Sequence, residues 1–178
     1  MSWPIEHFHY MPAASSFIEM MPGAMKAMTQ CAGLQRGENV TIACDTNKMR
    51  LAEALAAAAY AAGGIPTIAA FPPTGAHGAQ VPAPVVGACA NCDVFFLPTS
   101  WSMTHTDART EATKNGARGA TMCEVTEDCL CAGGILGDYE ENDRRGRSLG
   151  AVMAQGKSIR MTSPAGTDLT GKIEDRPV

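Results

Sequence analysis

The chain has 178 residues, of which 46% are hydrophobic, and its formal net charge is −4 at pH 7. This length suits one domain with a buried core, and the apolar content excludes an intrinsically disordered chain. The one basic cluster, at residues 144–147, follows an acidic run at residues 140–143, which argues against a nucleic-acid-binding surface.

No apolar run reaches the roughly 18 residues that a membrane-spanning helix needs. The N-terminal sequence MSWPIEHFHYMP also lacks the basic start and apolar stretch of a signal peptide. We therefore expect a cytoplasmic location. In that reducing compartment the 7 cysteines are expected to be buried thiols rather than disulfides.

The first predicted element is a helix over Ser15–Leu34, which Pro22 and Gly23 interrupt. Methionines at helical spacing within it predict a core-facing stripe: Met20, Met21, Met25 and Met28. We expect residues 1–36 to form an N-terminal segment and helix. An α/β domain over residues 37–178 follows, and the whole chain is expected to be a single globular unit.

A βαβ unit is predicted next. It consists of a strand at Asn39–Cys44, an alanine-rich helix at Met49–Ala62 and a second strand at Ile65–Phe71. The right-handed crossover through such a helix makes the two strands parallel. The proline- and glycine-rich segment Pro72–Pro84 then predicts an exposed loop.

Strands and helices continue to alternate in the rest of the chain. The predicted elements are a helix at Ala83–Ala90, a strand at Val94–Leu97, a polar segment at Pro98–Asp107, a helix at Ala108–Asn115, a strand at Gly119–Cys123, a short helix from Thr126, a longer helix at Asp138–Gln155, and strands at Ser158–Thr162 and Asp168–Ile173. This order predicts a Rossmann-like α/β fold, in which helices cover both faces of a mainly parallel sheet.

Ligands of such sheets bind at the carboxyl ends of the strands, so the segments at residues 45–48, 72–77 and 98–107 matter most. The third segment is rich in hydroxyl groups and holds His105, our candidate catalytic residue, because imidazole can exchange protons near neutral pH. The alternative is that His105 lies in the first turn of a helix that Thr104 or Thr106 caps.

The remaining candidates are residues that would bind a substrate. They are Ser100, Ser102, Thr104, Thr106, Asp45, Asn47 and His77. Asp45 has a simpler interpretation as the N-cap of the alanine-rich helix. His77 lies in a glycine-rich loop, where it would belong to a lid, contact a partner or be solvated.

No complete metal site is predicted in this chain. The pairs His7/His9, Cys89/Cys92 and Cys129/Cys131 lack further ligands at the spacing of a zinc or iron–sulfur site. Dinucleotide-binding, phosphate-loop, zinc-protease and serine-hydrolase motifs are absent from the sequence. A metal or redox role for Cys89 and Cys92 stays open as an alternative.

The ordered set of segments resembles the N-terminal half of a superfamily that contains the aminopeptidase T/aminopeptidase S metallopeptidases and the iron-dependent 2,5-dihydroxypyridine 5,6-dioxygenases. The resemblance covers about residues 37–175. It rests on Gly37-Glu38-Asn39-Val40, Asp45-Thr46-Asn47, the alanine-rich helix, Pro72-Pro73, Leu97-Pro98-Thr99-Ser100, Thr104-His105-Thr106 and the run from Thr162 to Leu169.

The resemblance implies that a C-terminal domain carries the metal ligands, and the sequence stops about where that domain would begin. Thr167 and Asp168 would mark the approach to it. Fe(II) or Zn(II) is therefore expected on a partner chain or missing domain, with no metal held by this chain. His105 stands where the dioxygenases place a histidine beside the substrate as an acid or base.

We accordingly expect a subunit of a metal-dependent enzyme that forms the substrate-side wall of an active site. Its substrate would be small and polar or aromatic, and its partner would be a chain with the metal site, in an oligomer without nucleic acid or membrane. The alternatives are a non-catalytic binding or assembly module and half of a metallo-aminopeptidase.

Overall fold

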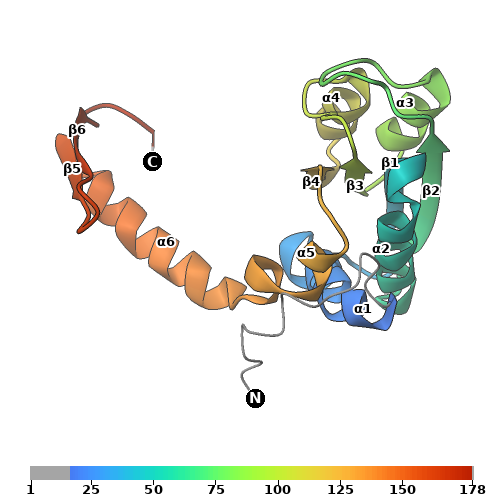
Figure 1. Cartoon of the computed structure of the whole chain (residues 1–178), viewed down its shortest axis with the longest axis horizontal. Helices are drawn as coiled ribbons and strands as arrows, with labels where there is room; N and C mark the ends of the chain where they lie inside the picture. Colours follow the sequence, from blue (N-terminus) through green and yellow to red (C-terminus); the bar gives the residue numbers. More distant parts are fainter. Residues whose placement is uncertain (1–16, 178) are drawn as a thin grey trace. The chain divides into compact units, whose positions relative to one another are not determined.

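The computed structural model describes residues 17–177, which form two compact units that divide between Gly137 and Asp138 (Figure 1). This differs from the single globular unit expected from the sequence. The first helix and the parallel sheet share one unit, so residue 37 does not separate compact units. No residue from 138 to 177 is buried, and the apolar core therefore ends with the first unit.

The first unit contains all of the parallel sheet. Its elements are α1 (Phe17–Lys26), the π-helical turn η2 (Ala27–Cys31), β1 (Asn39–Asp45), the 3-10 turn η3 (Thr46–Lys48), α2 (Met49–Ala61), β2 (Ile65–Phe71), α3 (Ala83–Ala90), β3 (Val94–Thr99), α4 (Asp107–Lys114), β4 (Arg118–Cys123), α5 (Asp128–Cys131) and the 3-10 turn η4 (Gly133–Leu136).

The four strands lie in the order β2-β1-β3-β4, and every neighbouring pair is parallel. The predicted Rossmann-like α/β architecture is confirmed. Because the chain moves from β1 outward to β2 and then returns to the other side of β1 for β3, the topological switch point lies between β1 and β3. Ligand crevices of open α/β sheets form at the carboxyl ends of such strands.

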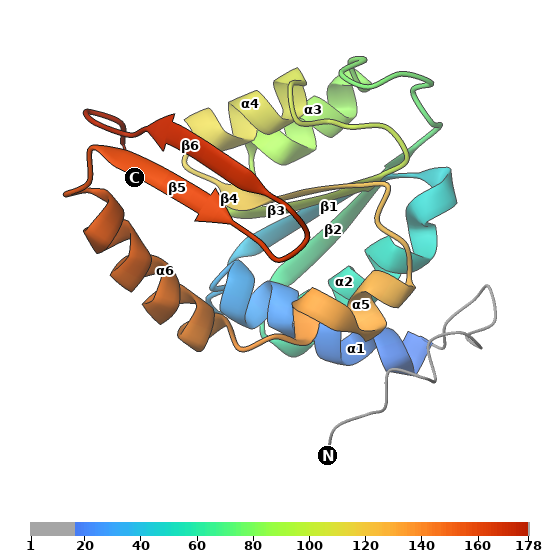
Figure 2. The ribbon, with the colours of Figure 1, turned by 60° about the vertical axis from the view of Figure 1, so that its left-hand side comes forward.

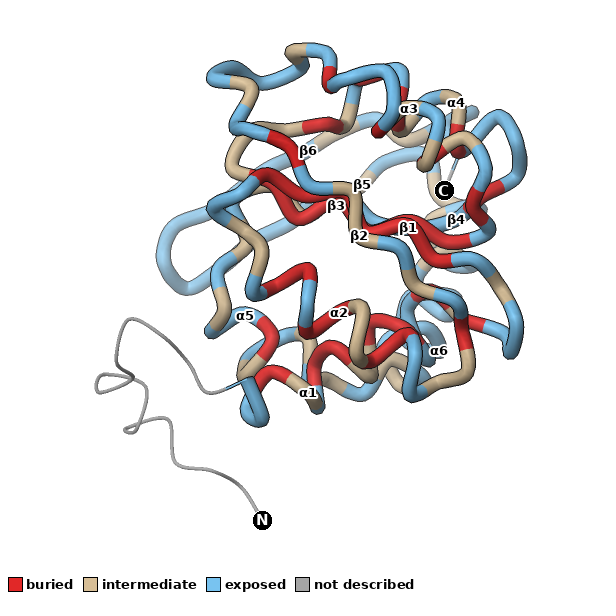
Figure 3. The backbone as a smooth tube through the Cα atoms, turned by 90° about the vertical axis from the view of Figure 1, so that its right-hand side faces the viewer, coloured by how far each residue is buried: buried red, intermediate tan, exposed pale blue. Residues whose placement is uncertain are grey.

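Helices cover both faces of the sheet, with α1, α2 and α5 on one side and α3 and α4 on the other (Figure 2). The alternation of side chains along each strand divides the core accordingly. Ile42 of β1 and Phe96 of β3 pack toward α1 and α2, whereas Ala43 and Phe95 pack toward α3 and α4. Figure 3 shows the buried residues gathered along β1 and β3 and on the helix faces that meet them.

The first helix is shorter than predicted. Its regular part ends at Lys26, and η2 carries the chain to Cys31, where Ala32 N donates to Ala27 O at 2.9 Å. Ser15, its predicted start, lies outside the described residues. The methionine stripe is confirmed, because Met20 and Met28 are fully buried and Met21 and Met25 pack against the same core.

The second unit consists of α6 (Tyr139–Met153), β5 (Ser158–Thr162) and β6 (Asp168–Lys172). Asp138 caps α6 by accepting from Glu141 N at 2.9 Å. The strands β5 and β6 form an antiparallel pair, as the turn between them predicts. In residues 17–177 no helix is both long enough and apolar enough to cross a membrane.

Candidate functional site

The carboxyl ends of β1 and β3 are tied together by Asp45. This side chain is only 1% exposed, and it accepts hydrogen bonds from Asn47 N at 3.0 Å, from Ser100 Oγ at 3.1 Å and from the backbone N–H of Ser100. Asn47 Nδ2 also donates to Ser100 Oγ at 3.3 Å. The structure therefore brings three predicted residues together at the switch point. It also shows Asp45 as the cap of η3, directly before α2.

The polar segment after β3 is held by its own hydroxyl groups. Ser102 Oγ donates to Thr104 Oγ1 at 2.9 Å, and Thr104 Oγ1 donates to Thr121 Oγ1 of β4 at 3.3 Å. Thr106 is fully buried, and its hydroxyl donates to Met103 O at 2.8 Å. Because the buried Thr106 hydroxyl already donates its hydrogen to Met103 O, it stabilises the turn and does not face a ligand. Thr106 therefore lies away from the surface on which we expected it.

His105 lies at the apex of this held turn, between Thr104 and the N-cap residue Thr106. Its side chain is exposed and makes no hydrogen bond or ion pair with any residue in the described part of the chain. The helix α4 begins at Asp107, and Thr106 makes no side-chain cap bond, so His105 precedes the helix rather than lying in its first turn. Its imidazole is therefore accessible to a bound molecule.

His77 connects the loop after β2 to the same segment. Its Nδ1 accepts a hydrogen bond from Ser102 N at 3.1 Å, and Gly78 N donates to Ser102 O at 2.9 Å. The His77 ring meets the ring of Trp101 edge-on, with the centroids 5.0 Å apart. Because Nδ1 accepts, the neutral ring carries its proton on Nε2. That N–H has no partner among the residues described.

Cys123, at the carboxyl end of β4, is a neighbour of this cluster that the sequence did not single out. Its Sγ lies 4.0 Å from Nδ1 of His77. Burial raises the pKa of the Cys123 thiol above its ordinary value, which favours the neutral thiol over a thiolate. The residue after it, Glu124, has a left-handed φ of 58°. The signal in the sequence is its position, because Cys123 is the last residue of the fourth parallel strand.

Residues 17–177 contain no group of three or more histidine, cysteine, aspartate or glutamate side chains that could hold a metal ion. Cys89 and Cys92 are free, buried thiols, and burial raises the pKa of Cys89 to about 12. Cys92 Sγ donates to Cys89 O at 3.1 Å, as expected of packing residues. The side chains of residues 17–177 therefore do not fit an Fe(II) or Zn(II) site. The predicted pair of His7 and His9 lies outside the described residues.

Comparison with known proteins identifies the family of this chain. The family model of 2,5-dihydroxypyridine 5,6-dioxygenase matches residues 19–178. The solved structure of a 2,5-dihydroxypyridine dioxygenase from Pseudomonas putida KT2440 is similar, with a TM-score of 0.66 and 15% sequence identity. That similarity covers 92% of this chain and 50% of the other chain, so this chain spans half the length of its structural neighbour. No curated protein matches the sequence. The chain belongs to the 2,5-dihydroxypyridine 5,6-dioxygenase family.

Proposed function

We propose that this chain forms the substrate-side wall of a metal-dependent, ring-cleaving dioxygenase and that a partner chain or a further domain carries the metal. The observation that carries the proposal is the exposed, unbonded His105 on a turn that is held on both sides. Family membership and the fold of the dioxygenase neighbour support the reaction class. The cytoplasm is the location expected for such an enzyme.

His105 is proposed to exchange a proton with a ring hydroxyl of the substrate. A dihydroxypyridine, the compound named for the structural neighbour, is a small aromatic molecule with such hydroxyl groups. Proton transfer by a positioned imidazole accelerates reactions by roughly 10²–10⁴-fold. The turn of residues 102–106 has its hydroxyl groups engaged internally, which keeps the imidazole in place without competing for its nitrogens.

Two further predicted residues have polar atoms that are available to bind a ligand. Neither Asn47 Oδ1 nor His77 Nε2 bonds to another residue within 17–177, so one can accept and the other can donate a hydrogen bond. Ser100 and Thr104 act as positioning residues in this proposal, because Asp45 and Thr121 engage their hydroxyls. Ser102 is also a positioning residue, because its backbone N–H donates to Nδ1 of His77.

The metal belongs to a partner chain or a further domain in this proposal, because residues 17–177 offer no ligand set for it. When bound, Fe(II) would supply activation of oxygen, and Zn(II) in a hydrolase would supply activation of water. Half-length coverage of the dioxygenase neighbour favours a partner chain or a further domain. A partner that activates water instead would make the chain half of a metallo-aminopeptidase, which stays an untested prediction.

Coexpression with the product of the neighbouring gene tests the proposal. We expect the purified pair to retain iron and to consume oxygen when 2,5-dihydroxypyridine is added, whereas each chain alone does neither. Retention of stoichiometric iron by the 178-residue chain alone would contradict the assignment of the metal to a partner. An iron-loaded pair that consumes no oxygen with this substrate would contradict the dioxygenase assignment.

The lack of a three-ligand cluster in residues 17–177 also favours a second candidate, a non-catalytic binding or assembly module. The same experiment separates the two candidates. A module binds 2,5-dihydroxypyridine or the partner chain but leaves the reaction rate of that partner unchanged.

A further inference from the structure

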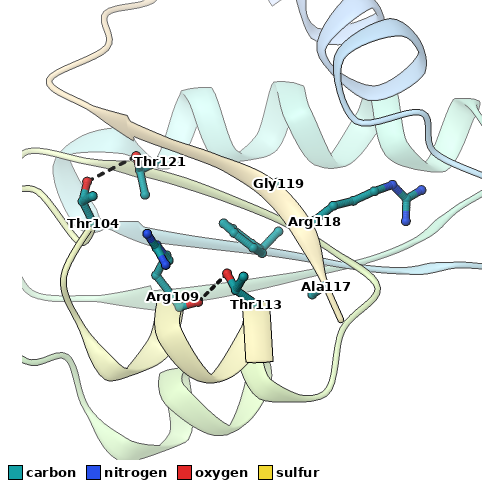
Figure 4. Close-up of a pocket in the computed structure, with 8 residues that line it drawn as sticks. Thr104, Arg109, Thr113, Ala117, Arg118, Gly119 and Thr121 are labelled. Carbon is teal, nitrogen blue, oxygen red and sulfur yellow. Dashed lines mark hydrogen bonds between the residues drawn. The ribbon is translucent and has the colours of Figure 1, made fainter. Parts of the chain in front are cut away.

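We propose that a pocket between α4 and β4 binds small planar carboxylates. The pocket has a volume of about 490 Å³ and lies beside β4, an edge strand of the sheet (Figure 4). Arg109 of α4 and Gly119 and Thr121 of β4 are among the residues that line it. It shares Thr104 and Thr121 with the strand-end site, and the inference does not depend on the proposed enzyme activity.

Arg109 gives the pocket a positive charge that no acidic side chain in the described part of the chain compensates. The residue is partly buried and forms no ion pair with any of the described residues. Figure 4 shows its guanidinium extending from α4 toward the strands. Arg118 also lines the pocket, but its guanidinium points away and binds Glu38 at 2.7 and 3.0 Å. None of the described residues that line the pocket carries a carboxylate, so an anionic ligand suits it.

The outer edge of β4 adds backbone donors. Arg118 N donates to Asp93 O at 3.1 Å, and Glu124 N donates to Thr99 O at 2.8 Å, so the even-numbered amides of β4 face β3. The two-residue period of a strand then turns the N–H groups of Gly119 and Thr121 outward. Both residues line the pocket, and within residues 17–177 no strand pairs with this edge.

The hydroxyl group of Thr121 completes the donor set. Its oxygen accepts from Thr104 Oγ1 at 3.3 Å, which leaves its own hydrogen available to a ligand. A guanidinium, two outward amides and this hydroxyl are all donors. Donor groups of this kind match the two oxygens of a carboxylate better than they match a neutral amide.

Gly119 explains the preference for a planar ligand. A Cβ at this position would overlap Phe95 O and would lie 2.9 Å from Cδ2 of the Phe95 ring. Because Gly119 has no side chain to cover it, the Phe95 ring lines the pocket. A flat aromatic ring that carries a carboxylate can lie against Phe95 while its oxygens reach Arg109 and the β4 amides.

Titration of the full 178-residue chain with benzoate tests the inference, with benzamide and acetate as comparison ligands. We expect benzoate to bind, and both comparison ligands to bind about tenfold more weakly or worse, since each lacks either the charge or the ring. Equal binding of benzoate and benzamide would overturn the role of the charge. Equal binding of benzoate and acetate would overturn the role of the ring, and failure of benzoate to bind would overturn the site.

Arg109→Gln is the matching variant, and Arg36→Gln is its control, because Arg36 is exposed and does not line the pocket. We expect Arg109→Gln to weaken benzoate binding by about tenfold or more and Arg36→Gln to leave it unchanged. Melting temperatures of both variants establish that they fold. Unchanged benzoate affinity in folded Arg109→Gln would overturn the proposal, and so would equal losses in the two variants.

Discussion

Replacing Asp45 with asparagine is the sharpest test of how the two central strand ends are joined. Asp45 is 1% exposed, and its carboxylate accepts from two backbone N–H groups and one hydroxyl. An asparagine offers one carbonyl oxygen and one NH₂ group in the same space. If the oxygen faces Ser100 N, the NH₂ group faces Asn47 N, and the reverse orientation exposes Ser100 N instead. Either way one backbone donor opposes another donor.

The expected cost follows from that arrangement. One hydrogen bond to a charged group is lost, and one buried donor is left without an acceptor, which together cost about 2–4 kcal/mol of the free energy of unfolding. Urea denaturation of the 178-residue chain measures this loss. Asp107→Asn is the control, since that side chain is exposed at the start of α4, and it should change the free energy by at most about 0.5 kcal/mol. Similar small losses in both variants would refute the account of the Asp45 contacts.

Three further predictions concern the core, the thiols and pH. Gly119→Ala should destabilise the chain by about 2 kcal/mol or more because its Cβ meets Phe95 O, whereas Gly87→Ala, in open space on α3, should stabilise it by roughly 0.5–1 kcal/mol in the same denaturation assay. Cys89, whose pKa burial raises to about 12, should resist alkylation at pH 8 in the native state and react in urea, as peptide mass mapping would show. A side-chain hydrogen bond from Arg118 lowers the pKa of Glu38, so the stability that this pair adds is present above the ordinary value of 4.5 and is lost as the pH falls through the lowered pKa. The stability difference between the wild type and Glu38→Gln should therefore shrink in acid, and a difference that stays constant with pH would count against the pair.

The sequence was sufficient to predict the elements that position the site. The run Asn39–Cys44, the alanine-rich helix and Ile65–Phe71 have unambiguous periods and clear turn residues between them, and the crossover rule then makes the strands parallel. The same rule placed Asp45 and the segment after β3 at one edge of the sheet, where the structure shows them in contact. The buried methionine stripe of α1 follows from helical spacing alone.

The periodicity of the sequence does not predict contacts across turns. Thr104 and Thr106 are two residues apart in an irregular segment, and nothing in their spacing indicates that one is fully buried and the other only partly. The approach of Cys123 to His77 depends on where the loop after β2 folds back, which is a tertiary effect. The π-helical end of the first helix and the separate unit at residues 138–177 likewise depend on packing rather than on local pattern.

The proton-transfer role of His105 is tested by the rate of oxygen consumption of the reconstituted pair with His105→Asn in place of the wild-type chain. Asparagine keeps a polar side chain of similar size but cannot exchange protons near neutral pH. We predict a rate lower by roughly 10²–10⁴-fold, with unchanged iron content and melting temperature, while Asp107→Asn keeps the wild-type rate. A His105→Asn pair that consumes oxygen at the wild-type rate would show that His105 does not transfer the proton.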